Sequence, residues 1–344
     1  MEKIEFLAGT EEKFKEFMGN LSASDKIALV SHTDHDGVAA AKVASEVVKY
    51  DVLKFVDYSE LNEDLVKELD MKGVNKIIMT DLGIDDVNVI QSMSIFADVL
   101  IIDHHLFKED VNSDKITFMN AKDYCATYLV YYLFSKIKNI EELDWLVACA
   151  SLADWMYFKN TEFMTKTYEK YGEVFSDDKI EVKKTKFWDV QFKIVLSTFY
   201  FEDNLLNVFE GIGKEFGELT GIEENIGEVQ KDIDDTLKRF ENEKEIYGDV
   251  YLWEFSSKFN IKSIVATLLS SKEQDKTFLI MSKHGNKYGI SARRQDKTVN
   301  LPEFLEKLLK GFEHSASGGH IPAAGASFLA RDLPEFKKRL KSLE

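Results

Sequence analysis

Short apolar runs alternate with helical patterns along the first half of the chain. Three of these runs contain mostly Ile, Leu, Val and Met and cover residues 27–30, 77–79 and 99–102. Short, continuously apolar runs between helical segments are typical of parallel strands that are buried on both faces. Residues 38–50, rich in Ala and Val, predict the helix after the first run, and residues 52–56 predict another strand. The pattern therefore indicates an α/β fold with a parallel sheet.

The pattern changes after residue 155. Residues 156–247 are rich in Lys, Glu and Asp, have scattered Phe and Tyr, and show no strong strand pattern. They predict a helical insertion and connector, with a long exposed helix over 223–245. The other expected elements are buried helices at 123–137 and 141–153, strands at 250–255, 277–283, 287–293 and 326–330, helices at 261–271, 301–311 and 333–343, and a glycine-rich turn at 318–325.

These patterns divide the chain into three parts. We expect an N-terminal parallel-sheet domain over residues 1–155, a helical insertion and connector over 156–247, and a smaller C-terminal α/β domain over 248–344. No stretch approaches the roughly 18 apolar residues of a membrane span, and the N-terminus lacks a signal-peptide layout. The two cysteines lie in apolar helical contexts and are expected to be free thiols. A cytoplasmic protein without a membrane partner is therefore expected.

The charged residues are distributed unevenly along the chain, and this matters for the kind of partner that the net charge suggests. A formal net charge of −17 argues against a nucleic-acid partner. Residues 251–344, however, hold 16 Lys and Arg against 10 Asp and Glu, a net of +6, so that residues 1–250 carry −23. An acidic half joined to a mildly basic half suits a short phosphate-bearing substrate, and it suits a long non-specific duplex poorly.

Acidic and histidine residues follow the predicted strands at the points where the strands end. S-H-T-D-H-D-G covers residues 31–37, M-T-D-L-G covers 79–83, I-I-D-H-H covers 101–105, and L-A-D-W covers 152–155 at the end of a predicted helix. Ligands bind at the carboxyl ends of the strands in open parallel sheets. Four carboxylates and at least one imidazole at that edge would form a metal site. Such an oxygen-rich site suits Mn²⁺ or Mg²⁺ better than structural Zn²⁺, which prefers thiolates.

Two of the motifs resemble those of a known family. D-H-H at residues 103–105 is the signature of the DHH phosphoesterases, and G-G-H-I-P-A-A-G at 318–325 is the signature of the DHH-associated substrate domain. With its motifs in the order of that family, the chain resembles a two-domain DHH phosphoesterase of the RecJ and nanoRNase type. The resemblance covers roughly residues 25–155 and 250–344.

The resemblance implies a pair of divalent cations, Mn²⁺ or Mg²⁺, and assigns roles to the motif residues. The metal ligands that it implies are Asp34, Asp36, Asp81 as the bridging carboxylate, His104 and Asp154. His32 is a further candidate ligand, although some relatives place this histidine four residues before the first aspartate, and here it is two before. Asp103 is implied to orient a histidine, and His105 to contact the scissile phosphate.

Candidate substrate contacts lie in the C-terminal domain. Gly318 and Gly319 can expose backbone N–H groups to an anion without an obstructing Cβ, and His320 beside them can donate a hydrogen bond to a phosphate. The resemblance implies that Arg293, at the end of a predicted strand, contacts a phosphate of the substrate, which a planar guanidinium binds through two N–H groups. Strand alternation predicts that Arg294 points to the opposite face.

The resemblance favours a single-strand-specific exonuclease that releases mononucleotides from single-stranded DNA or RNA or from short oligonucleotides. Two alternatives stay open. One is hydrolysis of a small nucleotide, such as a linear dinucleotide or 3′-phosphoadenosine 5′-phosphate. The other is an inactive, nuclease-derived scaffold protein of replication, against which the intact metal motifs argue. A second copy of the chain and a replication or repair protein are candidate partners.

Overall fold

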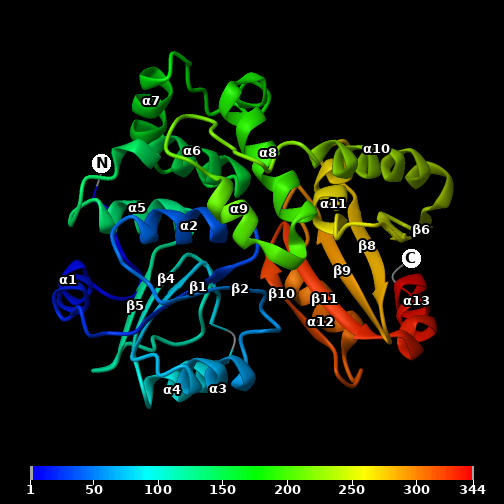
Figure 1. Cartoon of the computed structure of the whole chain (residues 1–344). Coiled ribbons are helices and arrows are strands. Elements are labelled where there is room, and N and C mark those ends of the chain that lie inside the picture. The colour runs from blue at the N-terminus through cyan, green and yellow to red at the C-terminus, as the bar shows by residue number, and fades with distance from the viewer. Residues whose placement is uncertain (1–2, 85, 343–344) are drawn as a thin grey trace. The chain divides into compact units, whose positions relative to one another are not determined.

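The computed structural model describes residues 3–84 and 86–342 and divides into two compact units, Met1–Ile226 and Gly227–Glu344 (Figure 1). Most of the predicted helical insertion, residues 156–226, packs within the first unit, and residues 227–247 belong to the second. Within the described residues, no helix is both long enough and apolar enough to span a bilayer. The predicted α/β architecture is confirmed in both units.

The first unit is built on a five-stranded parallel sheet. Its strands lie in the order β2 (Val52–Val56), β1 (Ile27–His32), β3 (Lys76–Thr80), β4 (Asp98–Asp103) and β5 (Ile116–Asn120). Every neighbouring pair of these strands is parallel. The three apolar runs form β1, β3 and β4 as predicted, and β5 adds an edge strand that was not predicted.

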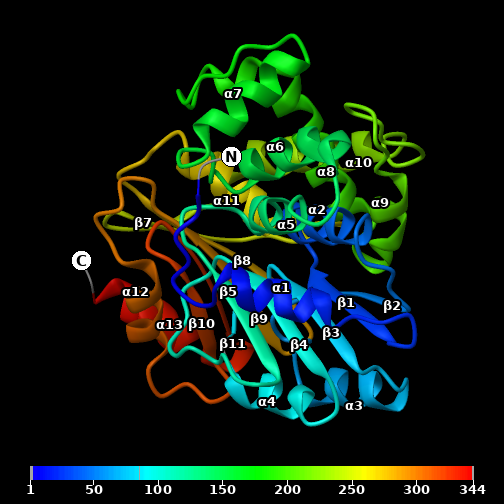
Figure 2. The same ribbon diagram turned by 90° about the vertical axis from the view of Figure 1, so that its left-hand side faces the viewer.

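Helices cover both faces of this sheet. They are α1 (Glu11–Gly19), α2 (His35–Ser45), α3 (Glu63–Met71), α4 (Val87–Ser94), α5 (Ala126–Phe134) and α6 (Asp144–Ala153). Figure 2 shows α2 and α5 on one side of the sheet and α3 and α4 on the other. Leu29, Ile78 and Leu100 pack in the core under α2 and α5, whereas Ala28 and Ile77 pack in the core with α3 and α4. Alternate residues enter different cores, which explains why each strand is apolar throughout.

The helical insertion extends the first of these cores. It contains α7 (Thr161–Lys170), α8 (Lys186–Tyr200) and α9 (Leu206–Gly211), with short 3₁₀ helices η2 (Val182–Lys184) and η3 (Glu202–Asn204). Tyr168 of α7 stacks on Phe187 of α8 with ring centroids 4.0 Å apart, and both side chains are buried in the core that includes α2 and α6. The insertion is therefore part of the first unit rather than a free linker.

The second unit is a six-stranded mixed sheet with helices on both faces. The strands lie in the order β10 (Ala316–His320), β11 (Ala323–Leu329), β9 (Lys287–Arg293), β8 (Thr277–His284), β7 (Val250–Glu254) and β6 (Glu245–Tyr247). The helices are α10 (Ile226–Glu243), α11 (Lys262–Ser270), α12 (Leu301–Leu309) and α13 (Leu333–Lys341). On one face Phe240 of α10 packs on Trp253 and Phe278, and on the other α12 and α13 enclose Leu279 and Phe328.

The glycine-rich segment differs from its predicted form. It is a β-hairpin rather than a turn, because β10 and β11 pair antiparallel from Ala316–Ser327 to His320–Ala323. The predicted strand at 326–330 accordingly begins earlier, at Ala323, and ends at Leu329. Small side chains allow this close pairing, and only residues 321 and 322 form the connection. The predicted last helix included residue 343, which lies outside the described residues.

Candidate metal centre

The candidate site lies where the order of the parallel strands reverses. β2 lies on one side of β1, and β3, β4 and β5 follow in sequence on the other. The helices that follow β1 and β3, α2 and α4, cover opposite faces of the sheet (Figure 2). In open α/β sheets this reversal point, at the carboxyl ends of the strands, is where ligands bind. The motif residues after β1, β3 and β4 all lie there.

A tight turn after β1 brings three candidate ligands together. His32 is the last residue of β1, and Asp34 caps α2, where its carboxylate accepts a hydrogen bond from the Gly37 N–H at 3.0 Å. Gly37 is required because a Cβ at this position would lie 2.4 Å from the carbonyl oxygen of His32. Asp36 lies in the first turn of α2 and is buried. One strand end thus supplies a histidine and two aspartates.

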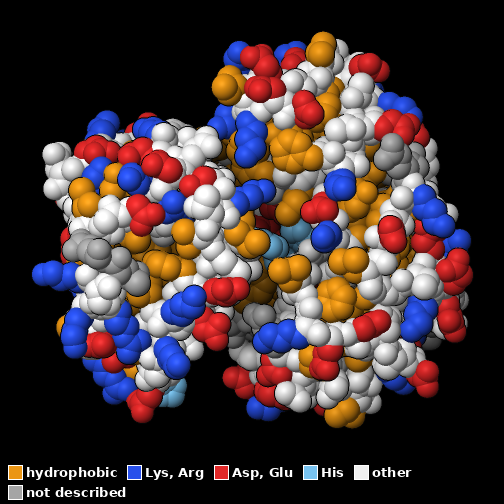
Figure 3. Space-filling view, turned by 180° about the vertical axis from the view of Figure 1, so that it is seen from behind, with side chains coloured by type: hydrophobic (Ala, Val, Ile, Leu, Met, Phe, Trp, Pro, Cys, Tyr) orange, Lys and Arg blue, Asp and Glu red, His pale blue; other side chains and the backbone are white. Residues whose placement is uncertain are grey.

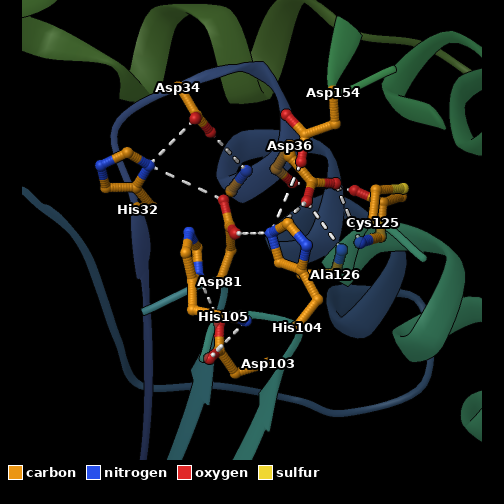
Figure 4. Close-up of polar contacts among 12 residues, drawn as sticks. His32, Asp34, Asp36, Asp81, Asp103, His104, His105, Cys125, Ala126 and Asp154 are labelled. Atoms are coloured by element: carbon orange, nitrogen blue, oxygen red, sulfur yellow. Dashed lines mark hydrogen bonds and ion pairs between the residues drawn. The ribbon is translucent and has the colours of Figure 1, made fainter. Parts of the chain in front are cut away.

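Asp81 lies at the centre of the cluster, directly after β3 (Figure 4). Its Oδ1 is 3.3 Å from Nε2 of His104, and its Oδ2 is 3.7 Å from Nδ1 of His32. The backbone of Asp81 has a φ of 59°, a left-handed conformation that aspartate adopts more readily than most residues. The two oxygens of one carboxylate therefore face two different groups of side chains.

The two groups are His32 with Asp34 and Asp81, and Asp36 with His104 and Asp154, and within each group the ligand atoms lie within 4.8 Å of one another. Nδ1 of His32 is 3.1 Å from Oδ2 of Asp34. Nε2 of His104 is 4.0 Å from Oδ2 of Asp36 and 3.5 Å from Oδ2 of Asp154, which reaches in from the C-terminal cap of α6. The structure therefore brings together all five ligands implied by the resemblance, and His32 with them.

Burial and crowding of carboxylates shift the ionisation of the cluster. Burial, together with the charge of Asp81, raises the pKa of Asp36 to about 7. Burial also raises the pKa of Asp154 well above its usual range. Burial opposes a charge on His104, but its hydrogen bond to Asp81 and the surrounding carboxylates outweigh this effect and raise the pKa of His104 to about 10. Without a cation, the cluster holds protons that a bound metal would displace.

The donor atoms fit a pair of divalent cations. Oδ2 of Asp81 is buried and accepts no hydrogen bond from a described residue, since Nδ1 of His32, at 3.7 Å, is too distant. A buried oxygen without a partner is unfavourable, and a cation between the two groups would remove that cost. Carboxylate oxygens are the donors that suit Mn²⁺ and Mg²⁺, and the candidate ligands include no thiolate, the donor that structural Zn²⁺ prefers.

Backbone groups of α5 hold Asp36 in place, which the sequence analysis missed. The N–H groups of Ala126 and Thr127 donate to the two oxygens of Asp36 at 2.7 and 3.0 Å, and the Thr127 hydroxyl donates to the Asp36 carbonyl at 2.8 Å (Figure 4). The N-terminus of a helix favours a negative charge in this way. No local signal in the sequence pairs residues 90 positions apart.

Asp103 and His105 form a second arrangement beside the cluster. Nδ1 of His105 is 2.8 Å from Oδ1 of Asp103, and Oδ2 of Asp103 accepts from the His105 N–H at 3.0 Å. Nε2 of His105 is 3.0 Å from the hydroxyl of Tyr58, whose ring lies on His32 with centroids 4.7 Å apart. A ring nitrogen of His105 also lies within 4.8 Å of ligand atoms of Asp81 and His104. Tyr58, in the loop after β2, was not predicted.

In the second unit, Arg293 and Arg294 have different surroundings. Arg294 forms ion pairs with Asp249 and Asp296, the latter at 2.9 Å from its Nε. Arg293 donates to the hydroxyl of Thr267 at 3.1 Å and forms no ion pair with any residue that the structure describes. Burial lowers the pKa of Arg293 to about 10, which leaves it charged at neutral pH. Arg293 thus keeps a cation without a protein counter-charge.

The register of the sheet places Arg293 and His320 in one row. Arg293 is paired with Ala323 of β11, and Ala323 is paired with His320 of β10. Residues directly opposite one another project to the same face, and two strand spacings amount to about 10 Å. Gly319 has a φ of 128°, and a Cβ there would lie 2.6 Å from the Ala323 carbonyl oxygen, whereas a Cβ at Gly318 would contact nothing. Gly318 is therefore open to a ligand, whereas Gly319 is required by the close approach of the neighbouring strand.

Two family domains match this chain. Residues 26–157 match the DHH family, N-terminal domain, and residues 250–343 match the DHHA1 domain. The chain belongs to the DHH family. The first match contains every candidate ligand of the metal centre, and the second contains Arg293 and the glycine-rich hairpin. No curated protein has a matching sequence.

Solved structures of this family share the fold at low sequence identity. Exonuclease RecJ bound to manganese has 14% identity and a TM-score of 0.68, over 100% of this chain and 96% of that chain. CDC45 from Entamoeba histolytica has 10% identity and a TM-score of 0.62, over 96% and 98%. A pGpG-specific phosphodiesterase from Vibrio cholerae has 16% identity and a TM-score of 0.50, over 92% and 98%. At these identities the similarity establishes the fold of this DHH protein.

Proposed function

We propose that this DHH protein is a metal-dependent phosphodiesterase that removes mononucleotides from single-stranded DNA or RNA, or from short oligonucleotides. The observation that carries the proposal is the position of Asp81, whose two oxygens face two groups of ligands. Two cations bound there would activate a water molecule and neutralise charge on the phosphoryl oxygens and the leaving group. The RecJ structure bound to manganese shares this fold.

The residues of the chain have distinct parts in this mechanism. One cation would be held by Asp34 and His32, and the other by Asp36, His104 and Asp154. Asp81 would contact both cations. Asp103 fixes the ring of His105 through Nδ1, and Nε2 lies 3.0 Å from the hydroxyl of Tyr58. Once His105 is protonated, Nε2 would donate to an oxygen of the scissile phosphate in place of this contact with Tyr58. The charge of Asp103 raises the pKa of His105 against the effect of burial, which favours that protonated form.

The substrate class follows from charge. A chain with a net charge of −17 and a basic C-terminal part suits a ligand with few phosphates, which favours single strands and short oligonucleotides over a long duplex. A linear dinucleotide is the second candidate substrate, on the same ground. The intact ligand groups argue against an inactive scaffold.

Product ladders would test the proposal. The purified protein is incubated with Mn²⁺ and with end-labelled DNA and RNA oligomers from two to about thirty nucleotides, as single strands and as blunt duplexes. We expect mononucleotides from the start of the reaction and much faster cleavage of single strands. Early release of mid-length fragments would instead indicate an endonuclease, and cleavage of dinucleotides alone would indicate the second candidate.

Replacing Arg293 by alanine should weaken substrate binding. The guanidinium has no protein counter-charge, so a phosphate would be its partner, and a charge-assisted hydrogen bond is worth ~1.5–3 kcal/mol. We therefore expect KM to rise by about ten- to hundredfold, with Mn²⁺ binding unchanged. Arg331→Ala is the matched control, because Arg331 is exposed and pairs with Glu313. An unchanged KM in Arg293→Ala would remove Arg293 from the substrate site.

A further inference from the structure

The turn after α6 holds a tryptophan where glycine is usual. The N–H of Trp155 donates to the Leu152 carbonyl at 3.1 Å, and the N–H of Met156 donates to the Ser151 carbonyl at 2.9 Å. These two bonds form a Schellman motif, in which the residue at the position of Trp155 takes a left-handed conformation and is usually glycine. Trp155 has a φ of 56°. A bulky side chain in this conformation is strained, and strained residues of this kind are concentrated at functional sites.

The indole of Trp155 belongs to a small aromatic cluster on the surface. Its ring centroid is 5.3 Å from that of Trp188 in the first turn of α8. Both rings are half-buried, whereas Trp145 and Trp253, the other tryptophans of the chain, are fully buried. An indole that keeps part of its surface in water has a face on which a flat ligand can stack.

Two lysines without carboxylate partners lie over these rings. Nζ of Lys179 is 5.4 Å from the centroid of the Trp155 ring, and Nζ of Lys183 is 5.2 Å from the same centroid. Neither forms an ion pair with any residue that the structure describes, although the neighbouring Lys184 pairs with Glu181 at 2.7 Å. Burial and the charge of Lys179 lower the pKa of Lys183. These cations lie just before the N-terminus of α8, which repels positive charge and attracts anions.

The cluster of Trp155, Trp188, Lys179 and Lys183 is connected to the metal centre through the backbone of Trp155. Trp155 directly follows Asp154, whose Oδ2 is 3.5 Å from Nε2 of His104. Both lysines are exposed, in a unit whose residues are strongly acidic overall. Figure 3 shows Lys and Arg side chains next to exposed apolar side chains over the helical part of this unit. Neither family domain includes the segment that carries Lys179, Lys183 and Trp188.

We infer that Trp155, Trp188, Lys179 and Lys183 form a binding site for an unpaired nucleotide of the substrate strand. The base would stack on the indole rings and displace the ammonium groups of the two lysines, which lie over these rings in the free protein, and the lysines would then bind its phosphate. Aromatic rings beside cations are the combination with which proteins bind single-stranded nucleic acid irrespective of sequence. This inference rests on the proposed function, because it assigns the site to the same substrate.

Intrinsic fluorescence would test this site without cleavage. The other two tryptophans are buried, so the metal-free protein in EDTA should lose fluorescence when a short single-stranded oligothymidylate stacks on Trp155 and Trp188. We expect the Lys179→Ala, Lys183→Ala double variant to weaken binding at least about fivefold, and to lower the slope of log Kd against log salt by about 0.7, the contribution of one phosphate contact. Lys184→Ala, which removes a paired lysine of the same 3₁₀ helix, should bind as the wild type does.

The Trp155→Gly variant tests whether a loss of oligonucleotide binding occurs without a loss of folding. Glycine suits the left-handed turn, so the variant should keep its circular dichroism spectrum and unfold cooperatively while binding weakens at least about fivefold. Trp155→Phe should recover part of the affinity, because it restores an aromatic face. Three results would each overturn the inference. The first is absence of quenching in the wild type, and the second is wild-type affinity in both the double variant and Trp155→Gly. The third is equal quenching by poly-glutamate.

Kinetics distinguish this inference from the proposed function. With Mn²⁺, we expect the double variant to raise KM for the oligonucleotide at least about fivefold and to keep kcat, since it does not touch the metal ligands. If the wild type binds oligothymidylate through this cluster but hydrolyses no oligonucleotide, the proposed function fails and the site stands. If the wild type hydrolyses single strands and the variants match it in KM and in Kd, the site fails and the function stands.

Discussion

Asp81→Asn is expected to abolish phosphodiester hydrolysis. Among the residues that the structure describes, Asp81 is the carboxylate that faces both ligand groups, with Oδ1 toward His104 and Oδ2 toward His32, so its loss weakens both cation sites together. Metal ions supply several kcal/mol of transition-state stabilisation, which corresponds to a loss in kcat of roughly a thousandfold or more. Asparagine is the suitable replacement because it keeps the shape of aspartate and tolerates the left-handed φ of 59°. Turnover of single-stranded oligonucleotides with Mn²⁺ is the measurement.

A matched control shows whether the effect of Asp81→Asn comes from losing a metal ligand or only from losing a negative charge. Asp64→Asn removes a carboxylate of the same unit that is exposed and lies 3.3 Å from Lys67, and it should leave turnover unchanged. The Asp81→Asn protein should also remain folded, because the substitution relieves repulsion among buried carboxylates. If Asp81→Asn kept more than about a tenth of the wild-type turnover, catalysis by a pair of cations that share this residue would be wrong.

Affinity for Mn²⁺ is expected to rise steeply with pH, and more steeply below pH 7 than above it. The raised pKa of Asp36, about 7, means that this carboxyl is protonated in the metal-free protein at lower pH and must lose its proton to bind a cation. His104, with a pKa of about 10, must lose a proton throughout this range. Asp154 and His32, whose pKa values are also raised, release further protons on binding. The slope of log affinity against pH should therefore be greater below pH 7 than above it, by about one for the proton of Asp36.

Calorimetric titration with Mn²⁺ in buffers of different ionisation enthalpy would measure both the affinity and the protons released. Asp36→Asn should bind Mn²⁺ more weakly, because it removes a charged ligand, and it should lose the additional slope below pH 7 that the proton of Asp36 contributes. Equal slopes above and below pH 7 in the wild type would contradict the assignment of the proton to Asp36. An affinity that falls as pH rises would contradict the role of the cluster as a metal site.

The convergence of the ligands could be predicted because it depends on a simple property of parallel sheets. Asp34, Asp81 and His104 each come directly after a short apolar strand, and the carboxyl ends of such strands meet at one edge. Asp154 was predicted at the end of a helix and does lie at the cap of α6. The local pattern of apolar residues is sufficient to predict the positions of these ligands, because each of them lies at the end of a strand or helix that this pattern identifies.

Other features depend on contacts that local periodicity does not report. Tyr58 lies in a loop, and its bond to His105 joins residues 47 positions apart. β5 is a five-residue edge strand with a mixed pattern, I-T-F-M-N, that a short run does not distinguish from a loop. The glycine-rich segment contains residues typical of turns, yet its pairing with β9 extends it into a hairpin. In each case tertiary contacts decide the conformation.

The attachment of Asp34 and Asp36 to helix N-termini has a consequence for biogenesis. Main-chain N–H groups of α2 and α5 already neutralise part of the charge on these carboxylates. The polypeptide can therefore acquire its native structure before any ion arrives, unlike a zinc finger, whose folding depends on its metal. Ion supply would then decide when the protein becomes active, and a bound ion would add stability to a protein that has already folded.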